Sequence, residues 1–394
     1  MRVAIATRIY RPEPAAASLF LGSVADELLA LGHEVDVYTA TPPSDISSES
    51  HGERIRTAPV HRDKNGYVRG IAGYISFDVP LLFRLMFCRK PDVVFVEPPP
   101  TTGAVVRVVC ALRRIPYVYD AADIWSDAAQ LEPVSGLVVR VLRAIERFAL
   151  RGATHTVTVS EGVVKRVREL GSQRPVTVTG FGADTNQFPL TESPAEDLFL
   201  YAGSYSPYHG ADVLIDGFAK FLKTHPGYTL RFIGNGATQP ALEQRAEELG
   251  ITANVQHLDP VPPYELLTHL GSAVASLATI KPGTVYEYSY ASKAFSSLMA
   301  GCPVIFAGPG PTIDLLESAN TQVRAGVACE YTPSAVAAAM AGLADRRATQ
   351  EERRKLSEWT AAEHSLQAVT RRIANIIFET ANTRRTGRGE TNDG

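Results

Sequence analysis

The sequence predicts an α/β protein built from two doubly wound domains, and three observations support this prediction. The chain has 394 residues, which exceeds the length at which a single hydrophobic core usually stops growing. Short apolar stretches that suit strands alternate with amphipathic stretches that suit helices along almost all of it, a pattern typical of parallel sheets. The alternation breaks at the polar residues 191–197 and restarts at residue 198, so the domain boundary is expected there.

The first half begins with an apolar strand over residues 2–7, followed by a helix whose leucines repeat at helical spacing until Gly32. No G-x-G-x-x-G follows the first strand, which argues against a dinucleotide-binding domain of that kind. The remaining elements alternate in the same way. Strands are predicted at residues 33–38, 92–96, 116–120, 154–159 and 176–179, and helices at 103–112, 134–151 and 162–170.

Residues 41–76 show no regular pattern and are predicted to be irregular. They begin with a Pro-Pro-Ser-Asp turn and include a polar tract over residues 47–56. A mobile loop near an acceptor site and a mere insertion fit this composition equally well.

The predicted helix over residues 134–151 carries four arginines at steps of three, four and four, which gathers them on one side. Apolar residues accompany them, so the helix could rest on anionic lipid headgroups. A solvated face on a packed helix is the alternative interpretation. The arginines are Arg140, Arg143, Arg147 and Arg151, and the apolar residues are Leu137, Val138, Val141, Leu142 and Ile145.

The second half repeats the strand and helix alternation, and two longer helical stretches follow it. The polar residues 384–394 at the end are expected to be disordered. Strands are predicted at residues 198–202, 228–233, near 255, 273–277 and 303–306, and helices at 210–223, 240–249, 263–271, 292–300, 312–318, 333–344 and 350–379.

Composition and charge indicate a soluble protein of the reducing cytoplasm. The residues are 45% hydrophobic and 21% charged, and the four cysteines form no Cys-x-x-Cys pair. No apolar run of about eighteen residues is evident, and the chain begins directly with a strand, so a cytoplasmic location is expected. Residues 1–180 hold 22 Lys and Arg against 19 Asp and Glu, and the rest hold 17 against 23. The first half is therefore the side expected to face an anionic partner.

The stretch over residues 286–304 combines a tyrosine-rich approach, a helix start and a following apolar strand. Ser292 is a plausible N-cap, and Gly301 supplies the C-terminal stop. Free backbone N–H groups at such a helix start, with Lys293 beside them, would suit a phosphate. A simple helix cap is the alternative.

Ligands of open α/β sheets bind at the carboxyl ends of the strands, so the chemistry is expected in a cleft between the two halves. Asp120 and Asp123 follow a strand of the first half. Glycine-rich turns follow two strands of the second half, at residues 203–210 and 234–236. The two aspartates could also do no more than cap a turn.

In these segments the chain resembles the retaining nucleotide-sugar glycosyltransferases of family 4, which have the two-domain GT-B fold. The resemblance covers nearly the whole chain, and it is greatest to the branch that modifies cell-surface saccharides. Each segment alone is weak evidence for the family, but the order and spacing of all of them are specific to it. They are residues 32–39, 122–127, 159–162, 180–184, 201–204, 232–236, 292–295 and 299–305.

The resemblance implies two Rossmann-like domains that face each other across a cleft. The N-terminal domain, residues 1–182 completed by a C-terminal helix at 357–380, would bind the acceptor, with Asp123 facing its hydroxyl. Residues 195–356 would bind the nucleoside-diphosphate sugar. The donor-side residues would be Gly203, Ser204 and His209 at the diphosphate, Gly234, Asn235 and Gly236 at the nucleotide, and Ser292 and Lys293 at the phosphates.

The chain also departs from the family pattern. Ser204 and His209 stand where many members have Arg and Lys, and Tyr288 and Ser296 stand where a pair of glutamates is usual. Glu287 could substitute for the first glutamate, and Ser296, at the position of the second, is a further candidate for contact with the donor. Alternatively, other residues could bind the donor.

The predicted function is transfer of a sugar, with retention, from a UDP- or GDP-linked donor to a saccharide, lipid-linked or small-molecule hydroxyl. Asp123 and Lys293 are the expected catalytic residues, because a fixed cation stabilises a leaving diphosphate as its charge grows. No Asp-x-Asp occurs, so no metal and no cofactor are expected. The expected location is cytoplasmic, with peripheral contact to the inner face of a membrane, and no nucleic acid partner. A non-catalytic binding protein and a nucleotide-sugar epimerase or hydrolase are the alternatives.

Overall fold

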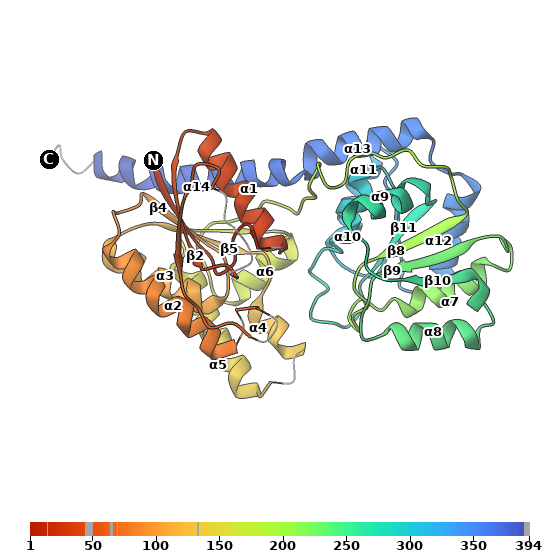
Figure 1. Ribbon diagram of the computed structural model, residues 1–394, viewed down its shortest axis with the longest axis horizontal. Coiled ribbons are helices and arrows are strands. Elements are labelled where there is room, and N and C mark those ends of the chain that lie inside the picture. The colour runs from red at the N-terminus through yellow and green to blue at the C-terminus, as the bar shows by residue number, and fades with distance from the viewer. Residues whose placement is uncertain (14, 44–49, 64–65, 69, 132–133, 390–394) are drawn as a thin grey trace. The chain divides into compact units, whose positions relative to one another are not determined.

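The computed structural model describes the whole chain except residues 14, 44–49, 64–65, 69, 132–133 and 390–394 (Figure 1). The chain forms two compact units. Unit 1 consists of residues 1–180 and 369–394, and unit 2 consists of residues 181–368. Each unit is organised around one wholly parallel sheet, as expected for strands joined by helical crossovers.

Unit 1 contains a seven-stranded sheet in the order β3-β2-β1-β4-β5-β6-β7. Its central strands are mainly apolar because helices cover both faces. The strands are β1 (Arg2–Ala6), β2 (Glu34–Ala40), β3 (Arg54–Ala58), β4 (Val93–Val96), β5 (Tyr117–Ala121), β6 (His155–Thr158) and β7 (Val176–Val178). The helices are α1 (Ala16–Ala30), α2 (Gly70–Phe87), α3 (Pro100–Arg113), α4 (Trp125–Ala128), α5 (Gly136–Gly152), α6 (Glu161–Glu169) and α14 (Leu366–Gly389).

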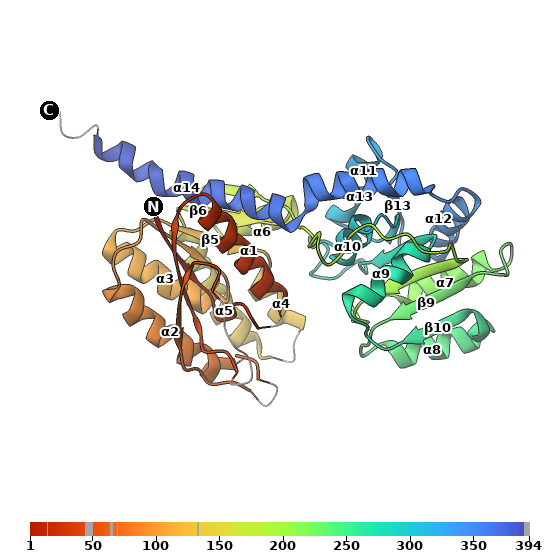
Figure 2. The same ribbon diagram turned by 45° about the horizontal axis from the view of Figure 1, so that its top comes forward.

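The last helix of the chain completes the core of unit 1. Ile373 and Ile377 of α14 pack with Val3, Ile5 and Leu21 in one buried cluster. On the other face of the sheet, α2, α3 and α5 lie side by side (Figures 1 and 2). The polar tail was predicted to be disordered from residue 384, but α14 continues to Gly389. Residues 390–394 lie outside the described part of the chain.

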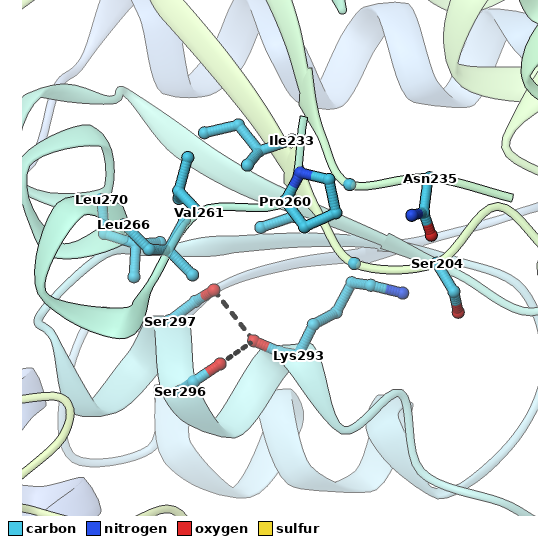
Figure 3. A pocket seen from close by; sticks show the side chains of 13 residues that line it. Ser204, Ile233, Asn235, Pro260, Val261, Leu266, Leu270, Lys293, Ser296 and Ser297 are labelled. Atoms are coloured by element: carbon cyan, nitrogen blue, oxygen red, sulfur yellow. Dashed lines mark hydrogen bonds between the residues drawn. The ribbon is translucent and has the colours of Figure 1, made fainter. Parts of the chain in front are cut away.

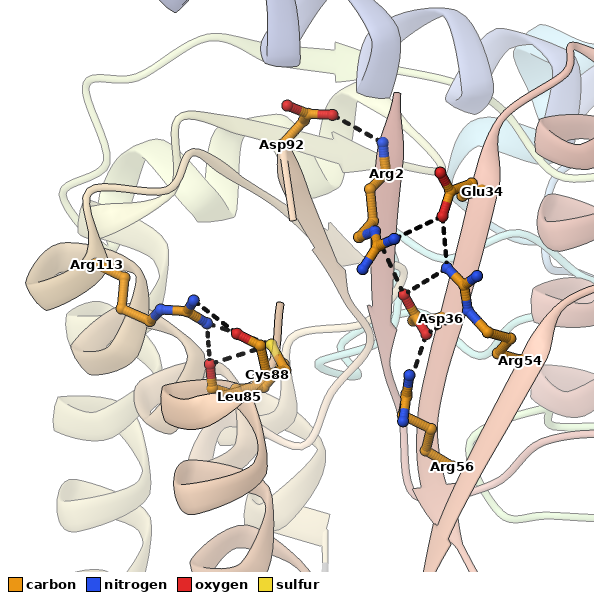
Figure 4. Close-up of polar contacts among 9 residues, drawn as sticks. All are labelled: Arg2, Glu34, Asp36, Arg54, Arg56, Leu85, Cys88, Asp92 and Arg113. Atoms are coloured by element: carbon orange, nitrogen blue, oxygen red, sulfur yellow. Dashed lines mark hydrogen bonds and ion pairs between the residues drawn. The ribbon is translucent and has the colours of Figure 1, made fainter. Parts of the chain in front are cut away.

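The prediction that residues 41–76 are irregular is wrong over β3 and the start of α2. The charged sequence of β3 concealed the strand, because β3 is an edge strand whose arginines pair with acids of β2. Arg54 and Arg56 each donate to Asp36, at 2.9 and 3.0 Å (Figure 4). The rest of the predicted loop falls partly on residues outside the described ones.

α2 also corrects the expectation that no apolar segment is long enough to cross a membrane. Its 18 residues satisfy that test by length and composition, although Asp78 and Pro80 interrupt the apolar run. A single such helix is weak evidence of a span. The inward side of α2 packs into unit 1 through Phe77, Leu81 and Leu85, which are buried.

Unit 2 contains a six-stranded parallel sheet in the order β10-β9-β8-β11-β12-β13. On one face of the sheet, aromatic residues of β8 and β9 pack against helices. On the other face, Phe295 and Leu298 of α10 pack against β12. The strands are β8 (Leu198–Ala202), β9 (Thr229–Ile233), β10 (Val255–Leu258), β11 (Ala275–Thr279), β12 (Val304–Ala307) and β13 (Gly326–Cys329). The helices are α7 (Asp212–Phe221), α8 (Gln239–Glu248), α9 (Pro263–Ser272), α10 (Lys293–Met299), α11 (Pro311–Asn320), α12 (Pro333–Asp345) and α13 (Gln350–His364).

The packing of α14 gives a stability prediction. Ile377 is fully buried, and the adjacent Phe378 is half exposed. Ile377→Ala should lower the free energy of unfolding of unit 1 by about 2–5 kcal/mol, because the cavity cannot fully collapse. The control Phe378→Ala should cost about 1 kcal/mol or less. The free energy of unfolding of each variant is measured by urea unfolding, with amide exchange in β1 as the probe of unit 1. Equal losses of free energy in the two variants would contradict this packing.

Candidate active site

A cavity of about 300 Å³ opens in unit 2 at the carboxyl ends of β8 and β9. Figure 3 shows its two unlike ends: apolar side chains of α9 and the turn before it gather at one, and the Lys293 amine extends toward Ser204 and Asn235 at the other. The main lining residues are Gly203, Ser204, Ile233, Gly234, Asn235, Pro260, Val261, Leu266, Leu270, Lys293, Ser296 and Ser297.

Two glycines allow the loops at the polar end to approach closely. Gly203 and Gly234 have φ of +136° and +142°, which favours glycine. A Cβ atom on Gly234 would lie 2.2 Å from the Gly203 carbonyl oxygen, and one on Gly203 would lie 3.0 Å from Lys293 Cε. A side chain at either position would force these segments apart and fill the polar end.

Lys293 is a half-buried cation at this end of the cavity. Its Nζ atom donates to Tyr201 Oη at 3.2 Å and lies 4.5 Å from the centroid of the Tyr201 ring. Burial lowers the pKa of Lys293 to about 8, so the amine is still mostly protonated at neutral pH. Within the described residues, no carboxylate oxygen lies within 4.0 Å of it to form an ion pair. The arrangement leaves a positive charge available to an anionic ligand.

The helix that carries Lys293 begins and ends within one residue of its predicted bounds, but Ser292 does not cap it as predicted. α10 has only seven residues, and the Ser292 side chain makes no cap hydrogen bond because the backbone of Ser292 is already helical. A helix this short has little dipole, so the lysine supplies most of the positive charge. Ser296 and Ser297 donate to the Lys293 carbonyl oxygen at 3.1 and 2.9 Å, which steadies the first turn.

Six of the predicted donor-side residues line the cavity: Gly203, Ser204, Gly234, Asn235, Lys293 and Ser296. The other four do not. Ser292 is exposed, and Gly236 packs against the backbone of Tyr205. Glu287 accepts a hydrogen bond from the Gly283 N–H, so its carboxylate serves a neighbouring turn. The expectation that Glu287 reaches the donor finds no support in this geometry.

His209 lies close enough to Lys293 for the lysine charge to affect its pKa, although it does not line the cavity. Burial, with the Lys293 charge adding to it, lowers the pKa of His209 to about 3. Its Nδ1 atom is buried and makes no hydrogen bond with any described residue. His209 is therefore a neutral imidazole at physiological pH, unlike the arginine or lysine common at such a position in the resembling family.

Unit 1 collects acidic side chains at the carboxyl ends of its central strands. Glu97 follows β4, Asp120 is the second-last residue of β5, and the exposed Asp123 comes three residues later. Burial raises the pKa of Glu97 to about 7, partly offset by Arg8. Burial, helped by the Glu97 and Asp123 charges, raises the pKa of Asp120 to about 8. Glu97 and Asp120 together therefore hold protons near neutral pH.

Other contacts of this cluster were not expected from the sequence. Thr7 donates to Glu97 Oε2 at 3.1 Å. The buried Arg8 donates to the Val68 carbonyl oxygen at 2.7 Å, and its guanidinium lies over the rings of Tyr74 and Trp125. Glu97 directly follows one apolar strand, and Asp120 lies near the carboxyl end of its neighbour. This similar position is the signal that could have identified Glu97.

Comparisons with known proteins identify one glycosyltransferase region in each unit. The family described as "Glycosyl transferase 4-like domain" matches residues 17–182, and the one described as "Glycosyl transferases group 1" matches residues 183–361. D-inositol 3-phosphate glycosyltransferase from Corynebacterium glutamicum is 26% identical over 413 residues, which cover 96% of this chain and 94% of that protein.

Two solved structures show a similar fold. Sucrose-phosphate synthase from Thermosynechococcus elongatus has a TM-score of 0.71 and 14% identity, covering 96% of this chain and 98% of that one. HepE from Anabaena, in complex with UDP and glucose, has a TM-score of 0.66 and 15% identity, covering 96% and 100%. The two matched families span both units, and we conclude that the chain belongs to the family 4 glycosyltransferases of GT-B fold, which transfer a sugar from a nucleotide sugar.

Proposed function

We propose that the chain is a hexosyltransferase that uses a UDP- or GDP-linked sugar and retains the anomeric configuration. The acceptor is the hydroxyl of a saccharide, a lipid-linked molecule or a small molecule. The observation that carries the proposal is the half-buried Lys293 amine, which points into a cavity at the carboxyl ends of two strands and has no carboxylate partner among the described residues. Retention is proposed from the resemblance to family 4.

The two ends of the cavity support one orientation of the donor. Leu266 and Leu270 offer an apolar surface to a base, and Ser204, Asn235 and Lys293 offer polar groups to a diphosphate (Figure 3). A similar structure contains UDP and glucose, which supports a nucleoside diphosphate as the ligand. When the glycosidic bond breaks, the diphosphate gains negative charge, and the fixed Lys293 cation stabilises that state more than the bound donor.

In unit 1, the exposed carboxylate of Asp123 is proposed to accept a hydrogen bond from the acceptor hydroxyl. Glu97 and Asp120 lie at neighbouring strand ends and hold protons near neutral pH, so they can donate to the other hydroxyls of a sugar. No metal is proposed, because Lys293 can supply the charge at the diphosphate and the sequence has no Asp-x-Asp. The proposed location is cytoplasmic, with peripheral membrane contact through unit 1, which the α5 arginines support.

Product analysis tests the proposed reaction. The protein is incubated with EDTA, a UDP- or GDP-hexose and a panel of acceptors, and the product is examined by NMR. The donor's anomeric configuration should persist in a new glycoside that forms only when acceptor is present. An inverted glycoside would reject retention. Free hexose or an epimer formed from donor alone would favour the hydrolase or epimerase alternative.

Removing the Lys293 amine should slow the transfer. Lys293→Ala should lower kcat/KM by an amount equivalent to about 2–4 kcal/mol of transition-state stabilisation, because one preorganised charge is lost. Lys223→Ala, at an exposed lysine outside the cavity, is the control and should leave kcat/KM unchanged. Unchanged turnover in Lys293→Ala would remove this residue from the mechanism.

Nucleotide binding should weaken at alkaline pH. Lys293 is protonated below its pKa of about 8, so binding of UDP or GDP is strongest there. Above pH 8 the amine must first take up a proton, and affinity should fall by up to roughly tenfold per pH unit. Calorimetry from pH 6.5 to 9.5 measures this.

Two variants identify the titrating group in that experiment. Lys293→Arg keeps its charge throughout, so its affinity should change little with pH. Lys293→Ala should bind weakly at every pH. A wild-type affinity that stays constant through pH 8–9.5 would show that the Lys293 charge does not hold the diphosphate.

A further inference from the structure

α2 displays a continuous row of large apolar side chains on its outer side. Every fourth residue belongs to the row, and each is at least half exposed. Residues four apart are neighbours on a helix, but each lies about 40° further round its axis. The row therefore crosses the outer side of α2 obliquely, over roughly 24 Å at 1.5 Å per residue. Its members are Ile71, Ile75, Val79, Phe83 and Phe87.

Neighbouring helices continue this surface. α3 packs against both α2 and α5, and both views show the three helices side by side (Figures 1 and 2). Leu112 of α3 is 69% exposed, and α5 exposes Leu137 and Val141. Most of the exposed large apolar side chains in the described chain lie on these three helices. We call the outer side of α2, α3 and α5 the docking face.

Contacts within unit 1 hold the docking face in place. The Arg113 side chain of α3 donates to the Leu85 and Cys88 carbonyl oxygens at the end of α2 (Figure 4). Asp78 of α2 accepts a hydrogen bond from Thr102 of α3 at 2.7 Å. The row of apolar side chains is therefore exposed on a packed helix, not on a detached one.

The charges of the docking face all have one sign. The three helices are described in full and contain two acids, Asp78 and Glu146, and both are buried. Glu146 accepts hydrogen bonds from the backbone N–H groups of Trp125 and Ser126. The exposed charges include Arg140, Arg147 and Arg151 of α5. Exposed apolar side chains accompanied, within these three described helices, only by exposed cations complement an anionic surface with an apolar interior.

We infer that the docking face binds the surface of an anionic lipid bilayer, with α2 lying in the plane of the interface. The apolar row enters the boundary between headgroups and acyl chains, and the arginines contact lipid phosphates. α2 cannot span the bilayer while its inner side remains packed in unit 1 with Asp78 buried there. A symmetric second copy is disfavoured, because it would bring cationic faces together.

If the proposed sugar transfer holds, the docking face also narrows the range of acceptor classes. A protein held on a bilayer by the acceptor-binding unit encounters hydroxyls that belong to membrane-embedded molecules. Among the three acceptor classes proposed above, the lipid-linked one is therefore favoured.

Vesicle sedimentation tests the docking face without any nucleotide sugar. The full chain should bind vesicles of phosphatidylcholine with 30% phosphatidylglycerol and bind pure phosphatidylcholine at least about tenfold more weakly, because only the first is anionic. The double variant Phe83→Ser/Phe87→Ser should lose about tenfold or more in affinity for the anionic vesicles. Arg140→Gln/Arg147→Gln should lose about tenfold, and added salt should weaken wild-type binding.

Matched substitutions elsewhere control for general effects. Leu31→Ser/Tyr264→Ser changes exposed apolar residues away from the docking face, and Arg346→Gln/Arg354→Gln changes exposed arginines of unit 2. Both controls should bind anionic vesicles as the wild type does. Thermal unfolding of every variant checks that it is folded.

Three outcomes would overturn the inference: no wild-type binding to anionic vesicles, equal binding by the docking-face variants, or a concentration-dependent dimer that the Phe83 and Phe87 substitutions dissociate. The last would assign the face to a second copy. Transfer from a nucleotide sugar is measured separately, with a panel of acceptors that includes a lipid-linked one solubilised in detergent. Vesicle binding without transfer would support the docking face and reject the proposed function. Transfer without vesicle binding would support the proposed function and reject the docking face.

Discussion

Lys293 is a cation that the fold half-buries against the Tyr201 ring and leaves without a carboxylate partner among the described residues. Burying a charge this way costs free energy, which its lowered pKa expresses. The structure keeps the amine at this position through several local features. Tyr201 lies beneath it, Gly203 leaves room beside it, and Ser296 and Ser297 bind the carbonyl oxygen of the same residue. An anionic ligand would offset that cost.

The two units present opposite chemistry at the carboxyl ends of their strands. Unit 2 offers a cation and glycine-rich turns around a cavity, which suit a phosphate-bearing donor. Unit 1 offers Glu97, Asp120 and Asp123, which suit the hydroxyls of an acceptor. This division of roles rests on burial as much as on residue type, because burial brings the pKa of Lys293 down toward neutrality and raises those of Glu97 and Asp120 toward it.

The sequence predicted both doubly wound sheets because their central strands are short, mainly apolar runs that alternate with helices, which is typical of buried parallel strands. It missed β3, whose arginines pair across the sheet edge with Asp36, and α2, whose glycines and Pro80 hide its helical repeat. Local pattern cannot show such tertiary pairing.

The candidate site was predicted in part. Lys293, Gly203 and Gly234 follow from a helix start and two glycine turns, all of them local signals. Leu266 and Leu270 line the cavity but resemble any core residue in sequence. The side-chain direction of Glu287 depends on a hydrogen bond within its own loop, which spacing does not reveal. The exposed row on α2 likewise depends on which side of the helix the sheet covers.

The most direct test of this account is an NMR titration of the Lys293 amine with and without a nucleoside diphosphate. Selective labelling of the lysine side chains, with Lys293→Arg to assign the signal, gives its pKa in both states. We expect a pKa of about 8 in the free protein and a higher pKa with UDP or GDP bound, because a nearby anion favours the charged amine. A pKa that nucleotide binding leaves unchanged would contradict the claim that Lys293 holds the diphosphate.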